Sequence, residues 1–175
     1  IVSKSFTPRM VARIDADVQV KARSVVAAVA EKGECDFVEE IASIFPLQII
    51  CEMMGIERDA WPRVLELTNV ILGAGDPEYT PDFATLMTAS LEMAALAQSV
   101  GEARLADPRD DLVSALMHAS VDGESLTAPE LASFFILLAA AGNETTRTAI
   151  SHGAWQLQQH PDQRAMWMAA PETHS

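Results

Sequence analysis

The chain has 175 residues, 49% of them hydrophobic and 21% charged, a composition that fits one folded unit with a sizeable core rather than a disordered segment. Its net charge of −13 and its lack of any Lys/Arg-rich run argue against binding to nucleic acid or to an anionic membrane surface. The most apolar charge-free stretch, residues 131–143, is much shorter than the roughly 20 residues of a membrane span, so we expect no transmembrane helix.

The first part of the chain predicts two helices after an early break at residues 6–9. Apolar residues recur every three or four positions over residues 14–29, and Gly33 follows as a plausible stop. Residues 38–54 are apolar on nearly all sides after the first turn, which predicts a buried helix. We expect Pro46 to kink this helix or to mark its early part.

Three further helices are predicted in the middle of the chain, at residues 61–72, 80–105 and 110–119. The glycine-rich residues 73–75 end the first of them. Thr80 is the predicted N-cap of the second, with Pro81 at the first helical position. Residues 121–124 follow the third helix as a turn.

The strongest local signal begins at Thr127, which forms a predicted capping box with Glu130 three residues later. Leu126 and Leu131 are placed to close a hydrophobic staple over it. No stop signal then occurs before Pro161, where a last short helix begins. The pattern predicts a helix of roughly 32 residues, or about 48 Å, in an all-α, mainly helical fold.

The middle of this long helix reads AAAGNETTRTA over residues 139–149, an unusual set of residues for a helix interior. At 100° per residue, one face carries Leu138, Ala141, Gly142 and Thr145. Because glycine costs about 1 kcal/mol relative to alanine inside a helix, Gly142 requires a reason. Two reasons are consistent with the sequence: close approach of another group to the backbone, or a local opening of the helical hydrogen bonds.

Two interpretations of the polar residues in this stretch stay open on local physics. Thr145 can bond back to the carbonyl of Ala141, or it can relay protons at the edge of an apolar pocket. Glu144 can be a proton source, or it can form a simple ion pair with Arg147 three residues later. The sequence alone does not choose between the chemical and the structural interpretation.

The cysteines and histidines do not predict a protein-ligated zinc site. Cys35 and Cys51 are far apart and are interpreted as reduced, buried thiols. The four histidines show none of the short spacings of zinc sites. His152 lies on the apolar side of the long helix and is interpreted as a satisfied core or pocket-rim histidine.

The AAGNETT stretch resembles the oxygen-activation motif of the cytochrome P450 family, which reads A/G-G-x-D/E-T-T on a long central helix. Four other segments resemble parts of bacterial members in the expected order. They are FTPR near the start, PLQIICEMMGI, DPRDDLVSAL and LQQHPDQ. The resemblance therefore extends along the whole chain, with the central motif as its most specific part.

The resemblance implies a role for each residue of the motif. Ala141 and Gly142 would lie over the distal face of the haem and leave a groove for O₂. Thr145 would contact the haem site and hydrogen-bond the oxygen that is being activated. Glu144 would feed protons from solvent, and Leu138 and Ala141 would border the substrate.

The resemblance also implies a cofactor, partners and a location. The cofactor would be haem b, and one oxygen atom of O₂ would enter an apolar substrate of sterol, terpenoid or fatty acyl type. Electrons would come from NAD(P)H through a ferredoxin-type donor and its reductase, in the cytoplasm. Residues 57–105 would form the mobile pair of helices that covers the pocket.

Three motifs of the family are missing, so that both haem-anchoring ends are absent: the H-x-x-x-R stretch that would precede Ile1, the E-x-x-R helix and the cysteine loop that ligates the iron. We therefore expect residues 1–175 to be a single partial domain, with the axial cysteine outside the chain and no activity in isolation. Two alternatives stay open, a non-enzymatic helical packing or interaction domain and a degenerate, truncated gene product.

Overall fold

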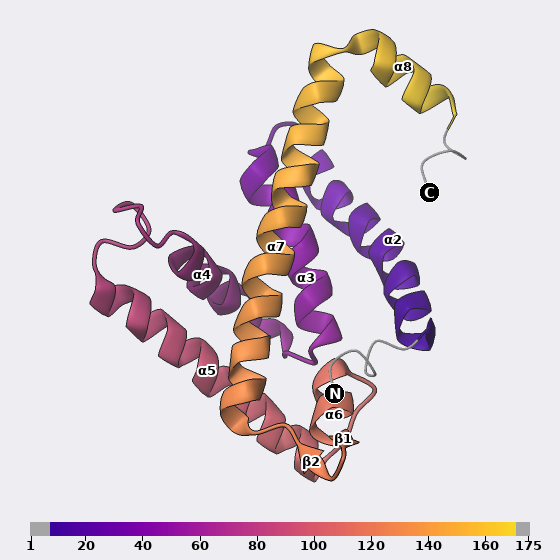
Figure 1. Cartoon of the computed structure of the whole chain (residues 1–175). Coiled ribbons are helices and arrows are strands. Elements are labelled where there is room, and N and C mark those ends of the chain that lie inside the picture. The colour runs from indigo at the N-terminus through magenta and orange to yellow at the C-terminus, as the bar shows by residue number, and fades with distance from the viewer. Residues whose placement is uncertain (1–7, 171–175) are drawn as a thin grey trace.

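A computed structural model of the protein describes residues 8–170, which are mostly helical (Figure 1). The α-helices of this range are α2 (Pro8–Ala30), α3 (Ile44–Met53), α4 (Trp61–Leu72), α5 (Phe83–Ala106), α6 (Leu112–Met117), α7 (Ala128–Gln159) and α8 (Pro161–Ala169). A π-helical turn at Val38–Ala42 precedes α3, and a 3₁₀ turn at Arg58–Ala60 precedes α4. The mainly helical fold is confirmed, whereas the predicted break at residues 6–9 lies partly outside the described residues.

Helix α7 is the longest element, and the other helices are arranged around it. Figure 1 shows it running through the centre of the molecule, with α4 and α5 on one side and α2 on the other. Its 32 residues confirm the predicted length. The capping box is also present, because the backbone N–H and the hydroxyl of Thr127 donate to the Glu130 carboxylate at 2.9 and 2.7 Å.

The core lies where α3, α4 and α5 pack against α7. Helix α7 buries one residue every four positions along this contact, namely Leu131, Phe135, Ala139 and Asn143. Close approach depends on glycine at two places. A Cβ on Gly101 of α5 would lie 2.5 Å from Leu131 Cδ2, and a Cβ on Gly142 would lie 3.1 Å from Cδ1 of Ile50 on α3.

The buried helix predicted at residues 38–54 is divided in two. The π-helical turn ends at Ala42, and α3 begins at Ile44. Pro46 is therefore in the first turn of α3, where the missing N–H would have no partner within the helix. The prediction that this proline marks the early part of a helix is confirmed.

Two other helix boundaries differ from the prediction. Asp82, not Thr80, is the N-cap of α5, because its carboxylate accepts the backbone N–H of Thr85 at 2.7 Å. The hydroxyl of Thr80 instead donates to the carbonyl of Val70 on α4 at 2.5 Å. Helix α6 starts at Leu112, two residues later than predicted, after the N-cap Asp111.

The turn predicted at residues 121–124 is confirmed, but the strands on either side of it were not predicted. Strands β1 (Ser120–Val121) and β2 (Glu124–Ser125) pair antiparallel, with Ser120 opposite Ser125. Asp122 and Gly123 both have positive φ, 56° and 85°, as a two-residue hairpin turn of type I′ requires. The hairpin directly precedes the start of α7. No helix within residues 8–170 has the length and apolar character that crossing a membrane requires.

Candidate functional site

The predicted site residues all lie on one continuous stretch of α7. Leu138 and Gly142 are half-buried, while Ala141 and Thr145 are exposed. The stretch is α-helical throughout, so the described structure shows no local opening of the helical hydrogen bonds at Gly142. Of the two reasons considered for this glycine, close approach is therefore the one observed, and the approaching group is Ile50 of α3.

Thr145 makes the backward hydrogen bond that the sequence allowed. Its hydroxyl donates to the carbonyl of Ala141 at 2.8 Å. The next residue, Thr146, makes the same bond to Gly142, also at 2.8 Å. Such a bond uses the hydroxyl proton and leaves the oxygen lone pairs able to accept from a group on the exposed side.

Glu144 is held by an ion pair on the other side of the helix. Its carboxylate pairs with the guanidinium of Arg147, and the hydroxyl of Thr148 donates to it at 3.3 Å. Arg147 also donates to the side-chain oxygen of Asn69 on α4, at 3.4 Å. The ion pair foreseen as the structural interpretation is therefore present, and it is tied to a second helix.

A cleft of about 310 Å³ opens beside this ion pair. Its lining comes from the end of α4, from the connection between α4 and α5, and from α7: Asn69, Leu72, Gly73, Ala74, Asp76, Tyr79, Glu144 and Arg147. Glu144 thus faces water, while Thr145 is turned by 100° toward the small-residue face of the same helix. Glu144 lines the cleft and its neighbour Thr145 lies on the small-residue face. This arrangement suits proton exchange between the cleft and that face.

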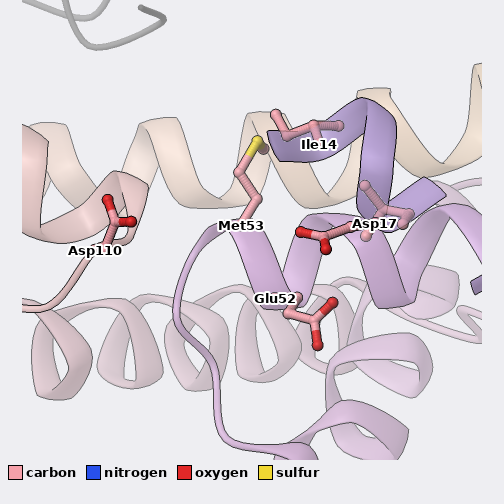
Figure 2. Close-up of a pocket in the computed structure, with 6 residues that line it drawn as sticks. Ile14, Asp17, Glu52, Met53 and Asp110 are labelled. Atoms are coloured by element: carbon pink, nitrogen blue, oxygen red, sulfur yellow. The ribbon is translucent and has the colours of Figure 1, made fainter. Parts of the chain in front are cut away.

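A second cavity, of about 170 Å³, lies between α2, α3 and the segment before α6. Figure 2 shows the carboxylates of Asp17, Glu52 and Asp110 around it. Glu52 is already paired with Lys21 at 3.0 Å. Among the described residues no group of His, Cys, Asp or Glu side chains is arranged to hold a metal ion. The cavity shares no lining residue with the cleft beside Glu144.

The two cysteines differ in their surroundings. Cys51 is fully buried on α3, as predicted, whereas Cys35 is exposed in the connection after α2, so the prediction that both are buried is wrong for Cys35. Burial raises the pKa of the Cys51 thiol to about 12, because the charged thiolate is poorly solvated in the core. A thiol in this state is a poor nucleophile and a poor iron ligand.

We expect Cys35 to react with iodoacetamide in the folded protein at mildly alkaline pH, and Cys51 to react only after unfolding. The reason is that the thiolate is the reactive form, and burial withholds it at Cys51. Peptide mass spectrometry before and after addition of denaturant measures the labelling of each site. Equal labelling of both peptides in the native protein would contradict this prediction.

Three side chains near the site have arrangements that the sequence did not indicate. His152 is exposed, so the interpretation as a core histidine is wrong for this residue. Asn69 lies far away in sequence but reaches Arg147, and no local pattern signals such a partner. Asn143 is completely buried, although it lies inside the AAGNETT motif. Its position four residues after Ala139 was the signal of burial in the sequence, because buried residues of α7 recur every four positions at Leu131, Phe135, Ala139 and Asn143.

Comparison with known proteins finds relatives that are named as hydroxylases and monooxygenases. No protein-family model matches the chain. It is 48% identical over 170 residues to a methyl-branched lipid omega-hydroxylase of Mycobacterium tuberculosis, a match that covers 95% of the chain and 40% of the relative. It is 36% identical over 174 residues to a steroid C26-monooxygenase of Mycolicibacterium smegmatis, covering 99% of the chain and 40% of the relative. The chain thus spans about two fifths of the length of these relatives.

A solved structure extends the comparison to the fold. The chain superposes on a Mycobacterium marinum cytochrome P450 in complex with pseudoionone with a TM-score of 0.90 and 37% identity, covering 98% of the chain and 42% of that protein. The motif on α7, the order of the helices and these similarities agree. The chain therefore belongs to the cytochrome P450 family.

Proposed function

We propose that the full-length protein is a haem-dependent monooxygenase that inserts one oxygen atom of O₂ into an apolar substrate. The observation that carries the proposal is the arrangement on α7, where Thr145 lies on an exposed face of small residues and Glu144 lines an open cleft. The names of the relatives, a lipid hydroxylase and a steroid monooxygenase, support the same reaction class.

The residues present fit one side of a haem. Ala141, Thr145 and Ala149 are exposed on α7, and their side chains are small enough for a flat macrocycle to approach the helix. The described residues offer no suitable axial ligand at Cys51, because its buried thiol has a pKa of about 12 and stays protonated. Cys35 lies in the connection after α2 rather than on α7, so we propose that the thiolate comes from outside the described residues. When bound, haem supplies electron transfer and O₂ activation.

The chain's own residues would then hold the substrate and move protons. Leu138 and Ala141 would border an apolar substrate, and the relatives favour a methyl-branched lipid or a steroid within the wider sterol, terpenoid and fatty acyl classes. Glu144 would exchange protons with water in the cleft. The hydroxyl of Thr145 would hold a proton at the reacting oxygen, having turned away from the Ala141 carbonyl.

The remaining parts of the proposal concern the whole protein. Electrons would come from NAD(P)H through a ferredoxin-type donor and its reductase, and the protein would act in the cytoplasm. Helices α4 and α5 would cover the substrate, and their packing against each other and against α7 suits that role. Residues 1–175 would be a single partial domain that lacks activity by itself.

The proposal is tested by replacing Glu144 with glutamine in the full-length enzyme. We expect turnover to slow at the proton-dependent step, on the order of 10²-fold, because the amide keeps the size of the side chain but does not release a proton. The measurement is the rate of oxygenated product formation and its solvent isotope effect. The matched control is Glu66→Gln, since Glu66 also pairs with an arginine three residues away, Arg63, but on the exposed side of α4.

Two contacts favour the alternative that this stretch serves helix packing alone. They are the backward bond of Thr145 and the ion pair between Glu144 and Arg147. If Glu144→Gln leaves both the rate and the isotope effect unchanged, Glu144 is only a partner of Arg147, and this alternative is correct for that residue.

A further inference from the structure

Two side chains in the core are polar, fully buried and without a hydrogen-bond partner among the described residues. Asn143 on α7 is 0% exposed, and neither its amide nitrogen nor its amide oxygen is bonded. Thr68 on α4 is also 0% exposed, and its hydroxyl is unbonded. Buried polar atoms are nearly always satisfied in folded proteins, by protein groups or by ordered water. These two residues therefore need an explanation.

The side chain of Thr68 is unusual for a helical hydroxyl in this protein. The hydroxyls of Thr88, Ser90, Thr145 and Thr146 each donate to the carbonyl four residues earlier, at 2.8 Å. Thr68 makes no such bond, although burial should favour it strongly. A partner outside its own helix would satisfy this hydroxyl.

The two orphaned groups belong to helices that are neighbours in the fold. Helices α4 and α7 pack against each other. Arg147, one turn after Asn143, donates to Asn69, the residue after Thr68. The cleft beside this contact is lined by Asn69 and Glu144, the sequence neighbours of the two buried residues.

We propose that Asn143 and Thr68 together bind one buried water molecule between α4 and α7. The Asn143 amide can both donate and accept, and so can the Thr68 hydroxyl, which gives the water the two to four polar partners that a buried water needs. The bridge positions α4 against the segment of α7 that carries Glu144 and Thr145. Asn143 and Thr68 are thus positioning residues. The water site stands without the proposed function, whereas its effect on substrate binding rests on that function.

The first test is a crystal structure of the full-length protein at a resolution that orders internal water. The expected result is a water about 2.7–3.2 Å from Thr68 Oγ1 and from one amide atom of Asn143. A direct bond between the two side chains, or protein partners for both of them, would overturn the proposal. This test needs no variant and no activity, so it is independent of the proposed monooxygenase reaction.

The second test is a double-mutant cycle with Thr68→Val and Asn143→Leu, followed by denaturant unfolding. Each single variant should lower the ratio of folded to unfolded protein about tenfold, because it leaves the other group orphaned in the core. The double variant should lose clearly less than the product of the two single losses. Additive losses would contradict a shared water. Thr88→Val is the control, since Thr88 is exposed and bonded to its own helix.

A kinetic readout separates positioning from mere stability. In the full-length enzyme, Asn143→Leu should raise KM for the substrate several-fold with kcat within about twofold of the wild type, because a loosened α4 covers the substrate less well. Unchanged KM in a variant that is measurably destabilised would show that the bridge is structural only and would overturn the positioning role. If the enzyme shows no monooxygenase activity at all, the proposed function fails, and the crystallographic test still decides the water site.

Discussion

The Thr145→Val variant of the full-length enzyme is expected to consume electrons while forming little oxygenated product. Valine keeps the shape and branching of threonine and removes only the hydroxyl. Because Thr145 is exposed and its one bond within the described residues is to the carbonyl of its own helix, the fold should change little. Haem and substrate should still bind. Oxygen should then leave as hydrogen peroxide, because its protonation is no longer directed.

The measurement is the ratio of oxygenated product to electrons consumed, with peroxide counted in the same assay. The matched control is Thr146→Val. Thr146 is the next residue, is exposed and makes the same 2.8 Å bond to the preceding turn, but it lies about 100° around the helix from Thr145. The control should keep the ratio of the wild type. An unchanged ratio in Thr145→Val would refute the proton-directing role, whatever the control shows.

The length and position of α7 could be predicted because both of its ends carry local signals. Thr127 and Glu130 form the capping box within three residues of each other, and Pro161 prevents the helix from continuing. The start of α5 could not be predicted as well. Thr80 and Asp82 are both good N-caps, and the choice depends on the bond from Thr80 to Val70 on another helix.

In the candidate site too, contacts within one helix could be predicted from the sequence, whereas contacts to other helices could not. The stretch from Leu138 to Thr145 contains its own pattern, and the backward bond of Thr145 and the ion pair of Glu144 connect residues within one turn. The partners on α4, Asn69 and Thr68, belong to another helix, and their contacts depend on how the two helices pack. The exposure of Cys35 likewise depends on tertiary structure rather than on local sequence.

A buried ion pair near the start of α6 was not indicated by the sequence either, and its removal should have the largest effect on stability. Arg104 on α5 and Asp111 before α6 are only 4% and 6% exposed. Arg104 Nε donates to Asp111 Oδ2 at 2.5 Å, and its other nitrogen donates to the carbonyl of Gly55 at 2.6 Å. Asp111 also accepts the backbone N–H of Ser114 at 2.7 Å. One guanidinium thus joins α5, the start of α6 and the connection that follows α3.

We expect Arg104→Met to reduce the free energy of unfolding of the full-length protein by about 3–5 kcal/mol, because it leaves the carboxylate of Asp111 buried without its counter-charge. Denaturant unfolding followed by circular dichroism measures this value. The control is Arg63→Met. Arg63 pairs with Glu92 and Glu66 on the surface, where water screens the charges, so its loss should change stability little.

Combining Arg104→Met with Asp111→Asn tests whether the cost comes from the isolated charge. The asparagine can still cap α6 through its side-chain oxygen, but it carries no charge into the core. The double variant should therefore be more stable than Arg104→Met alone, which additive effects of two damaging substitutions would not give. If the double variant is less stable than both single variants, the main loss is the bond from Arg104 to Gly55. The contact between α5 and α3, rather than the ion pair, would then hold this end of the molecule together.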